Sequence, residues 1–246
     1  MNTSIGIDAL SNGAFIALSL VVFAAWVGLH SWRGFRPRLF ALGLAWLALP
    51  LLLATSGALQ ALIGTPWVAA YLLLCNGAAV ALALSRYGQD VIDAVPIEFL
   101  IAFQAFRLPL ELLLHHWFDI GVVPIQMTYE GLNFDITTGV LALLVPVAMR
   151  VSPARARWGW ALGFNLIGSV LLLSVMVIAV QSVPSPLRSF MDEPALLLPF
   201  YAPQTWIVSV CVVGALWAHV VSFRWLAAEW RGRRQSSSSD SDGIPR

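Results

Sequence analysis

Residues 39–85 form a run of 47 residues that contains no charged side chain. An α-helix crosses the hydrocarbon core of a bilayer with about 20 apolar residues, so this run is too long for one crossing and long enough for two. Gly64, Thr65 and Pro66 interrupt it, and this turn-forming sequence predicts two helices joined by a tight hairpin. The run therefore restricts the chain to a multi-pass membrane fold.

Seven apolar segments can be counted along the chain, and they predict an all-α polytopic membrane protein with seven transmembrane helices. The composition agrees, because 59% of the 246 residues are hydrophobic, 11% are charged and the mean hydropathy is +0.80. We expect one transmembrane domain over residues 1–230 and a polar, disordered tail over residues 231–246. The predicted spans are 11–30, 39–59, 66–84, 92–114, 132–150, 159–183 and 203–224.

The arginines predict the orientation of these spans. All 14 basic residues are Arg, and 12 of them follow the first, third, fifth and seventh spans. Because basic residues accumulate in cytoplasmic loops, this pattern places the N-terminus outside and the C-terminus in the cytoplasm. The first residues, MNTSIGIDAL, carry an acid and no basic group, which indicates a short translocated tail rather than a cleaved signal peptide.

The residue types present exclude or disfavour several cofactors and partners. The absence of Lys rules out a retinal or pyridoxal Schiff base and the Lys of a phosphate-binding loop. The chain carries no nucleic-acid-binding signature. His30 and His219 are isolated on different spans, which is too little to predict a bis-His haem, and Cys75 and Cys211 suit packing positions in apolar spans. A divalent metal ion is the one cofactor that the residues leave open.

Four polar side chains lie on one face of the otherwise apolar fourth span: Gln104, Arg107, Glu111 and His115. At ~100° per residue of α-helix they fall within an arc of about 80°. A charge at the middle of a membrane helix costs roughly 2.5–3.5 kcal/mol on insertion scales, so such residues face a protein interior or a watery cavity. Pro109 removes a backbone hydrogen bond here, which predicts a kink or an opened turn. The stripe is either a polar pocket or a neutralised ion pair that braces the bundle.

The beginning of the fifth span brings further polar groups to the same depth. Asn133 and Asp135 precede a helix that descends beside the fourth span, where Arg107 could bridge Glu111 and Asp135. Capping of the fifth helix is the alternative role for the Asn and the Asp. In the pocket interpretation, the ligand-binding residues are Gln104, Arg107, Glu111, His115, Asn133 and Asp135.

Glu111, His115 and Asp119 recur every fourth residue, so they stack on one helical face if the helix continues that far. Carboxylate and neutral imidazole are ligands for zinc and other divalent ions, which makes the triplet a candidate metal site. Histidines near a membrane interface are also commonly solvated or bonded to a loop, and no H-E-x-x-H motif supports the metal. The pattern leaves both roles open.

Three segments contain unusual, ordered polar residues: FRLPLELLLHHW at 106–117, PIQMTYEGLNFDITTG at 124–139 and SPLRSFMDEP at 185–194. Together they resemble a family of uncharacterised bacterial multi-pass membrane proteins with a segment of the form MTxEGxNFDIxxG. The resemblance implies an integral protein of the bacterial inner membrane. It carries over no activity and assigns no site residue.

Three functions are compatible with these observations. The polar stripe, Pro109 and an acidic outer face favour binding or translocation of a small polar or charged solute in the outer half of the bundle. The first alternative is a membrane-embedded enzyme, metal-assisted through Glu111, His115 and Asp119, that acts on a lipid or quinone-like substrate. The second is an accessory subunit of a membrane complex. The expected partners are the lipid bilayer, a small ligand and either a second copy or a larger complex.

Overall fold

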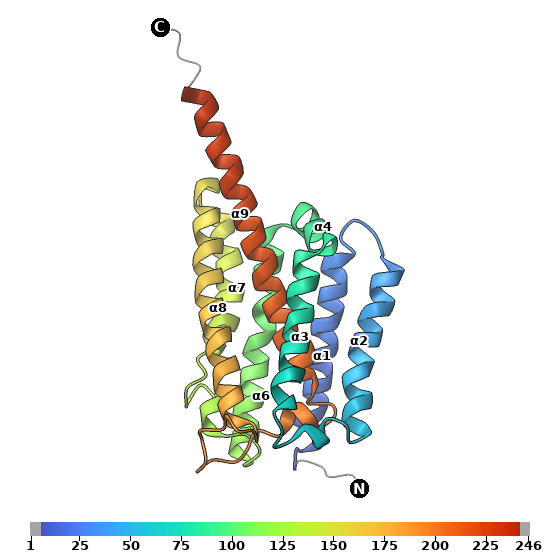
Figure 1. Ribbon diagram of the computed structural model, residues 1–246. Coiled ribbons are helices and arrows are strands. Elements are labelled where there is room, and N and C mark those ends of the chain that lie inside the picture. The colour runs from blue at the N-terminus through green and yellow to red at the C-terminus, as the bar shows by residue number, and fades with distance from the viewer. Residues whose placement is uncertain (1–5, 242–246) are drawn as a thin grey trace.

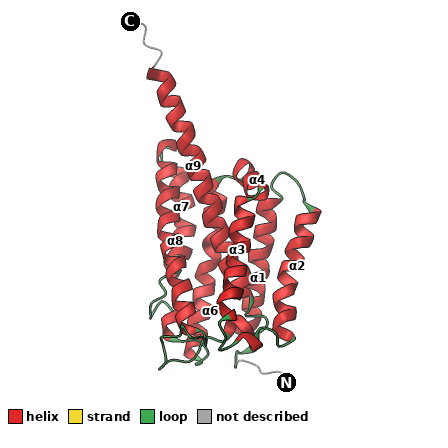
Figure 2. Cartoon of the chain, in the orientation of Figure 1, coloured by secondary structure: helices red, strands yellow, loops and turns green. Residues whose placement is uncertain are grey.

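The computed structural model describes residues 6–241, and side chains as far as Gln235. The chain is 76% helical, the described residues contain no strand, and the helices form one elongated bundle (Figures 1 and 2). The predicted all-α class is therefore confirmed. The α-helices are α1 (Ala9–His30), α2 (Pro37–Thr55), α3 (Trp67–Leu84), α4 (Arg86–Ala94), α5 (Ile97–Phe103), α6 (Arg107–Asp119), α7 (Ile136–Val151), α8 (Arg157–Ser182) and α9 (Val213–Ser241).

Five helices in the described part of the chain are long and apolar enough to cross a membrane: those over Ala9–His30, Pro37–Thr55, Trp67–Leu84, Ala154–Ser182 and Ile207–Gln235. They match the predicted first, second, third, sixth and seventh spans. The second and third are two separate helices, as the break at Gly64 predicted, and Gly64 adopts a φ of 79° in the connection.

The predicted fourth and fifth spans correspond to shorter elements. The fourth span was predicted over 92–114, but residues 92–94 belong to α4 and a new helix begins only at Ile97. Pro96 explains the break, because the residue before a proline is driven away from helical angles and Val95 is extended. The new helix is interrupted by the 3₁₀ turn η2 (Gln104–Phe106) between α5 and α6.

Two glycines let helices approach closely around the middle of the bundle. A Cβ atom at Gly139 of α7 would lie 2.4 Å from the backbone nitrogen of Leu108 in α6. A Cβ atom at Gly168 of α8 would lie 2.6 Å from Cε1 of His219 in α9. Gly139 therefore lets α7 approach the backbone of α6, and Gly168 leaves room on α8 for the His219 ring of α9.

The last rod of the bundle begins with a π-helical segment, η6 (Ile207–Val212), and continues through α9 beyond the other helices (Figure 1). Residues 231–241, which were predicted to be disordered, are helical, and residues 242–246 lie outside the described range. Helix elongation explains this difference, because each added residue gains a backbone hydrogen bond without a new nucleus. Arg233 also pairs with Glu229 one turn earlier, at 3.3 Å.

Candidate functional site

Arg107 is the centre of a buried polar chain that connects α6, α7, α8 and α9. It is the first residue of α6 and only 1% exposed. Its Nε donates to Oδ2 of Asp135 at 2.5 Å, and its Nη2 forms an ion pair with Oδ1 of the same carboxylate without making a hydrogen bond of good geometry. Two guanidinium nitrogens thus face the two oxygens of one carboxylate, and the Nε contact is the hydrogen bond of good geometry between them.

The Asp135 side chain binds Arg107 and does not cap the helix that follows it. It occupies the N-cap position of α7, yet its side chain makes no capping hydrogen bond. The hydroxyl of Thr138 donates to its Oδ1 at 3.1 Å instead. The capping role that the sequence left open therefore does not apply to the Asp135 side chain, which contacts Arg107 as the pocket interpretation required.

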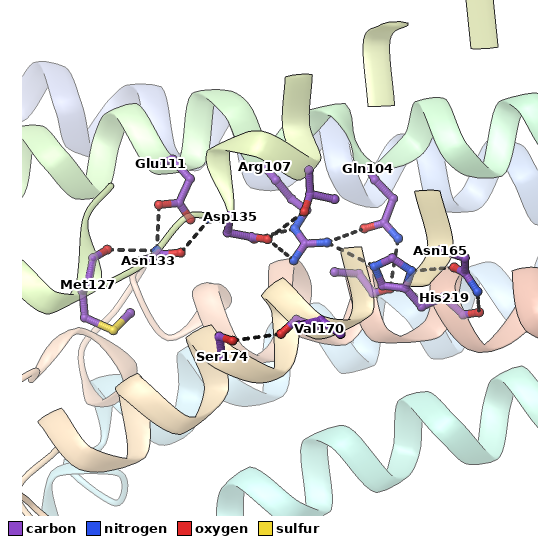
Figure 3. Close-up of polar contacts among 12 residues, drawn as sticks. Gln104, Arg107, Glu111, Met127, Asn133, Asp135, Asn165, Val170, Ser174 and His219 are labelled. Atoms are coloured by element: carbon purple, nitrogen blue, oxygen red, sulfur yellow. Dashed lines mark hydrogen bonds and ion pairs between the residues drawn. The ribbon is translucent and has the colours of Figure 1, made fainter. Parts of the chain in front are cut away.

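The other side of the guanidinium faces a histidine that the sequence had not placed in this cluster. Nη1 of Arg107 lies 3.1 Å from Nε2 of His219 and donates to Oε1 of Gln104 at 3.4 Å. Nδ1 of His219 lies 2.6 Å from Oδ1 of Asn165. Because an amide oxygen only accepts, Nδ1 carries the proton and Nε2 is the acceptor that Arg107 uses. Figure 3 shows this line of contacts from Asp135 to Asn165.

Glu111 belongs to this buried polar chain, but its side chain does not contact Arg107. Its Oε2 accepts from Nδ2 of Asn133 at 2.7 Å, and the same Nδ2 donates to the carbonyl of Met127 at 3.0 Å. Oδ1 of Asn133 in turn accepts from the backbone N–H of Asp135 at 3.1 Å. Arg107 therefore does not bridge the two carboxylates as predicted; instead, Asn133 connects the Glu111 carboxylate to the backbone N–H of Asp135 (Figure 3).

The predicted metal ligands are not brought together. His115 lies 3.6 Å from Glu130 and packs its ring on Tyr129, with the centroids 4.5 Å apart. Asp119 is exposed at the end of α6. Across the described residues there is no group of three His, Cys, Asp or Glu side chains that could hold a metal ion.

A second histidine on α6 ties this helix to the start of α1. Nε2 of His116 lies 2.8 Å from Oδ2 of Asp8, which also accepts from the hydroxyl of Ser11 at 2.5 Å. The hydrogen bonds from Ser11, together with that from His116, hold the pKa of the Asp8 carboxyl well below its ordinary value. Trp117 adds a buried hydrogen bond from its Nε1 to Oγ of Ser11 at 3.0 Å. These contacts fix the C-terminal end of α6, opposite the end at which Arg107 lies.

The polar chain itself is closed. Gln104, Arg107 and Glu111 are each 1% exposed, Asn133 is fully buried and Asp135 is 4% exposed. The three best-formed grooves found among the described residues are apolar, and none of these five residues lines them. The arrangement is thus a dry, hydrogen-bonded line of one cation, two carboxylates and one neutral histidine.

No family model, no curated protein and no solved structure matches this chain. The class that fold and site define is a helical protein with several membrane-compatible helices and a buried Arg–carboxylate–His chain. Any function has to be argued from that geometry.

Proposed function

We propose that the chain is an integral protein of the bacterial inner membrane with seven spans, its N-terminus outside and its C-terminus in the cytoplasm. The rod from Ile97 to Asp119 supports a fourth span, because at ~1.5 Å per residue it is about 34 Å long. The apolar helix α7 supplies the fifth. The start of α1 and the end of α9 lie at opposite ends of the bundle, as an odd number of spans requires (Figure 1).

We further propose that the buried polar chain binds and translocates a small charged solute, either a proton or a monovalent cation. The observation that carries this proposal is Glu111. Its carboxyl is buried and, among the described residues, no cationic side chain forms an ion pair with it. Arg107 and Asp135 neutralise each other and leave Glu111 uncompensated.

An uncompensated carboxylate in an apolar interior is costly, so a buried carboxyl of this kind holds a proton or takes up a cation. The remaining members of the polar chain suit a conformational relay, since the Asn133 amide and the Arg107 guanidinium connect helices but do not themselves take up and release a proton. Asn133 connects Glu111 to the backbone of Asp135, and Arg107 connects Asp135 to His219. The solute would enter from the C-terminal end of α6, where His115 lies one turn beyond Glu111.

Release of a solute from this buried polar chain requires a helix that can change its conformation. The 3₁₀ turn η2 ends directly before Arg107, and Pro109 follows two residues after it. Pro109 has no N–H for the carbonyl of Ala105, so this turn holds fewer backbone hydrogen bonds than a regular helix. Interrupted helices of this kind are where membrane transporters build their ion and solute sites.

Ion flux into liposomes tests the proposal. Purified protein is reconstituted with a pH-sensitive dye or a sodium-sensitive dye inside, and flux is started by an imposed membrane potential. We expect one of the two ions to enter through the wild-type protein and Glu111→Gln to abolish that flux. The matched control is Glu229→Gln, which changes an exposed carboxyl near the C-terminal end and should leave flux unchanged. Wild-type liposomes that carry neither ion would refute translocation of these ions.

A second candidate function is favoured by the closure of the site. Because the polar chain is buried and Asp135 neutralises Arg107, the cluster can brace an accessory subunit of a larger membrane complex. The two functions differ in the double variant Arg107→Met/Asp135→Leu. Replacing a buried ion pair with apolar residues of similar volume is often neutral for stability. A brace would survive the exchange and still co-purify with its partner, whereas a relay would fold and lose flux.

A further inference from the structure

The carboxyl group of Glu111 is buried between α6 and the turn that precedes α7 (Figure 3). Its Oε2 accepts from Nδ2 of Asn133 at 2.7 Å, whereas no group among the described residues donates to its Oε1. One oxygen of the carboxyl is therefore bound by an amide, and the other is left for the solute. The groups around this carboxyl distinguish between the two solutes, a proton and a monovalent cation.

Charge alone does not separate these two solutes. The titratable and charged side chains on α6 and on the elements packed against it are in pairs, except for the exposed Asp119 at the end of the helix. The pairs are Arg107 with Asp135, Arg107 with His219, His115 with Glu130 at 3.6 Å, and His116 with Asp8 at 2.8 Å. None of these groups neutralises Glu111, and a bound proton or a bound cation would each do so.

The oxygens beside Glu111 are already bound to N–H groups. Both N–H bonds of the Asn133 amide are used, one on Oε2 of Glu111 and the other on the carbonyl of Met127 at 3.0 Å. Oδ1 of Asn133 accepts from the backbone N–H of Asp135 at 3.1 Å. The carbonyl of Thr128, in the same turn, accepts two backbone N–H groups. Asn133 thus presents its nitrogen, and not an oxygen, to the carboxyl.

A metal cation requires a different environment. Hard cations take about six or more oxygen ligands, and sodium sites in membrane transporters use the carbonyls of unwound backbone. Glu111 offers one oxygen without a partner, and the amide N–H that contacts the other oxygen would repel a cation. Glu111 also lines none of the three best-formed grooves among the described residues. A proton needs neither several ligands nor space for an ion.

We propose that the solute is a proton, and that Glu111 carries it as a neutral carboxylic acid while the polar chain is closed. This inference rests on the proposed translocation and deepens it. A hydronium ion at the C-terminal end of α6 gives up the proton, which forms a bond to Oε1 and leaves a water molecule. Oε2 keeps the hydrogen bond from Asn133, because the carbonyl oxygen of an acid still accepts.

The proton leaves when the helix changes its conformation at η2 and Pro109 and exposes the carboxyl to the opposite side. The Oε1–H bond then breaks, a water molecule on that side takes the proton, and Glu111 returns as a carboxylate. Asn133 and Arg107 hold no proton of the cycle, because an amide and a guanidinium do not exchange one at neutral pH. Glu111 is thus the one carrier.

Infrared spectroscopy of the full-length protein in lipid nanodiscs tests the closed state. Spectra are recorded at neutral pH with N-methylglucamine as the buffer cation. We expect the wild type to show the C=O stretch of one protonated carboxylic acid, which shifts in heavy water and is lost in Glu111→Gln. Glu229→Gln, which changes an exposed carboxyl, is the matched control and should keep the band. Absence of the band in the wild type, or its loss when sodium or potassium chloride is added, would overturn the proton assignment.

Flux through the wild-type protein separates failure of this inference from failure of the proposed function, and it does not depend on a variant that folds. Proton entry into liposomes is followed without sodium and with equal potassium on both sides, with valinomycin present. Entry of radioactive sodium and rubidium is followed at equal pH. We expect proton entry, its complete loss in Glu111→Gln, and tracer entry no faster than into protein-free liposomes. Tracer entry that Glu111→Gln abolishes would overturn the proton assignment and leave the proposed function standing. Entry of neither protons nor tracers would overturn both.

Discussion

Two residues of α9, Trp217 and His219, lie on nearly opposite faces of one helix and lead to two different environments. His219 is hydrogen-bonded at both ring nitrogens, to Arg107 and to Asn165. Trp217 is equally buried, yet its Nε1 has no hydrogen-bond partner. The His219 face of α9 therefore belongs to the hydrogen-bonded polar chain, whereas the Trp217 face carries a buried donor that no protein group accepts from.

This contrast indicates which of the two sides of α9 depends on existing hydrogen bonds. On the Trp217 side, Nε1 of Trp217 and Nε2 of His30 are buried without a partner, so a substitution there breaks no hydrogen bond at these atoms. A solute that enters the polar chain has to replace existing bonds, and only the carboxyl of Glu111 lacks a charged partner there. We therefore expect the polar chain to act through a conformational change, and substitutions on the Trp217 side to act through packing.

The largest expected effect comes from breaking the ion pair. Asp135→Ala leaves Arg107 buried and unpaired, which should lower the free energy of unfolding by about 3–5 kcal/mol. Asp90→Ala removes the partner of Arg36 in a largely solvent-exposed pair and should cost at most about 1 kcal/mol. Denaturant unfolding in one detergent, followed by circular dichroism, measures both. Equal losses would mean that the pair around Arg107 is hydrated, and that the chain is not dry.

The next effect compares the two buried histidines through one substitution. His219→Phe leaves Oδ1 of Asn165 without its donor and should cost about 1–3 kcal/mol. His30→Phe removes an atom that has no partner, and the carbonyl of Trp26 keeps its helical hydrogen bond, so this variant should stay within about 1 kcal/mol of the wild type. Thermal unfolding midpoints of the two proteins test the ranking. The reverse order would show that His30, and not His219, is the residue built into the structure.

A smaller difference is expected from adding one methyl group on either side of α9. Gly168→Ala brings a Cβ atom to 2.6 Å from the His219 ring and should cost roughly 1–2 kcal/mol through overpacking. Gly214→Ala, about one turn before Trp217 on α9, meets its nearest atom, in Phe103, at an ordinary 3.4 Å. This second variant should gain roughly 0.5–1 kcal/mol of helix stability. The same unfolding assay decides, and a gain for both variants would mean that the helices at Gly168 can move apart.

Part of this arrangement could be predicted from the sequence. The spacing of Gln104, Arg107 and Glu111 puts them on one face of a helix, and Asp135 begins the next helix beside them. The depth of these residues in the membrane follows from the lengths of the apolar segments, and the direction of each span follows from the charges of its loops. The contact between Arg107 and Asp135 could therefore be expected. The role of Asn133 could not, because an amide that bonds a carboxylate has the same sequence pattern as an amide that caps a helix.

Contacts made across the bundle were beyond sequence reasoning. His219 is more than a hundred residues from Arg107, and no periodicity within α9 shows which face turns toward α6. The unpaired Trp217 was hidden for a different reason, because tryptophans are ordinary in membrane proteins and only packing reveals which ones lack a partner. The helical continuation over residues 231–241 was missed because composition alone does not account for elongation from an existing helix.

The smallest effect concerns the contact between the start of α1 and the helix α6. Asp8 accepts hydrogen bonds from Ser11 on α1 and contacts His116 on α6. Its folded-state pKa is lowered from the ordinary 3.8, so the folded state keeps this carboxyl ionised in acid more readily than the unfolded chain does. The stabilisation is complete above about pH 4 and is lost as the pH falls through the folded pKa, because the unfolded chain takes up the proton first. Asp8→Asn should flatten this acid limb of the unfolding profile and leave stability at neutral pH only slightly lower, since the site is exposed. An unchanged acid limb would mean that α1 and α6 are held together by the buried bond between Trp117 and Ser11 alone.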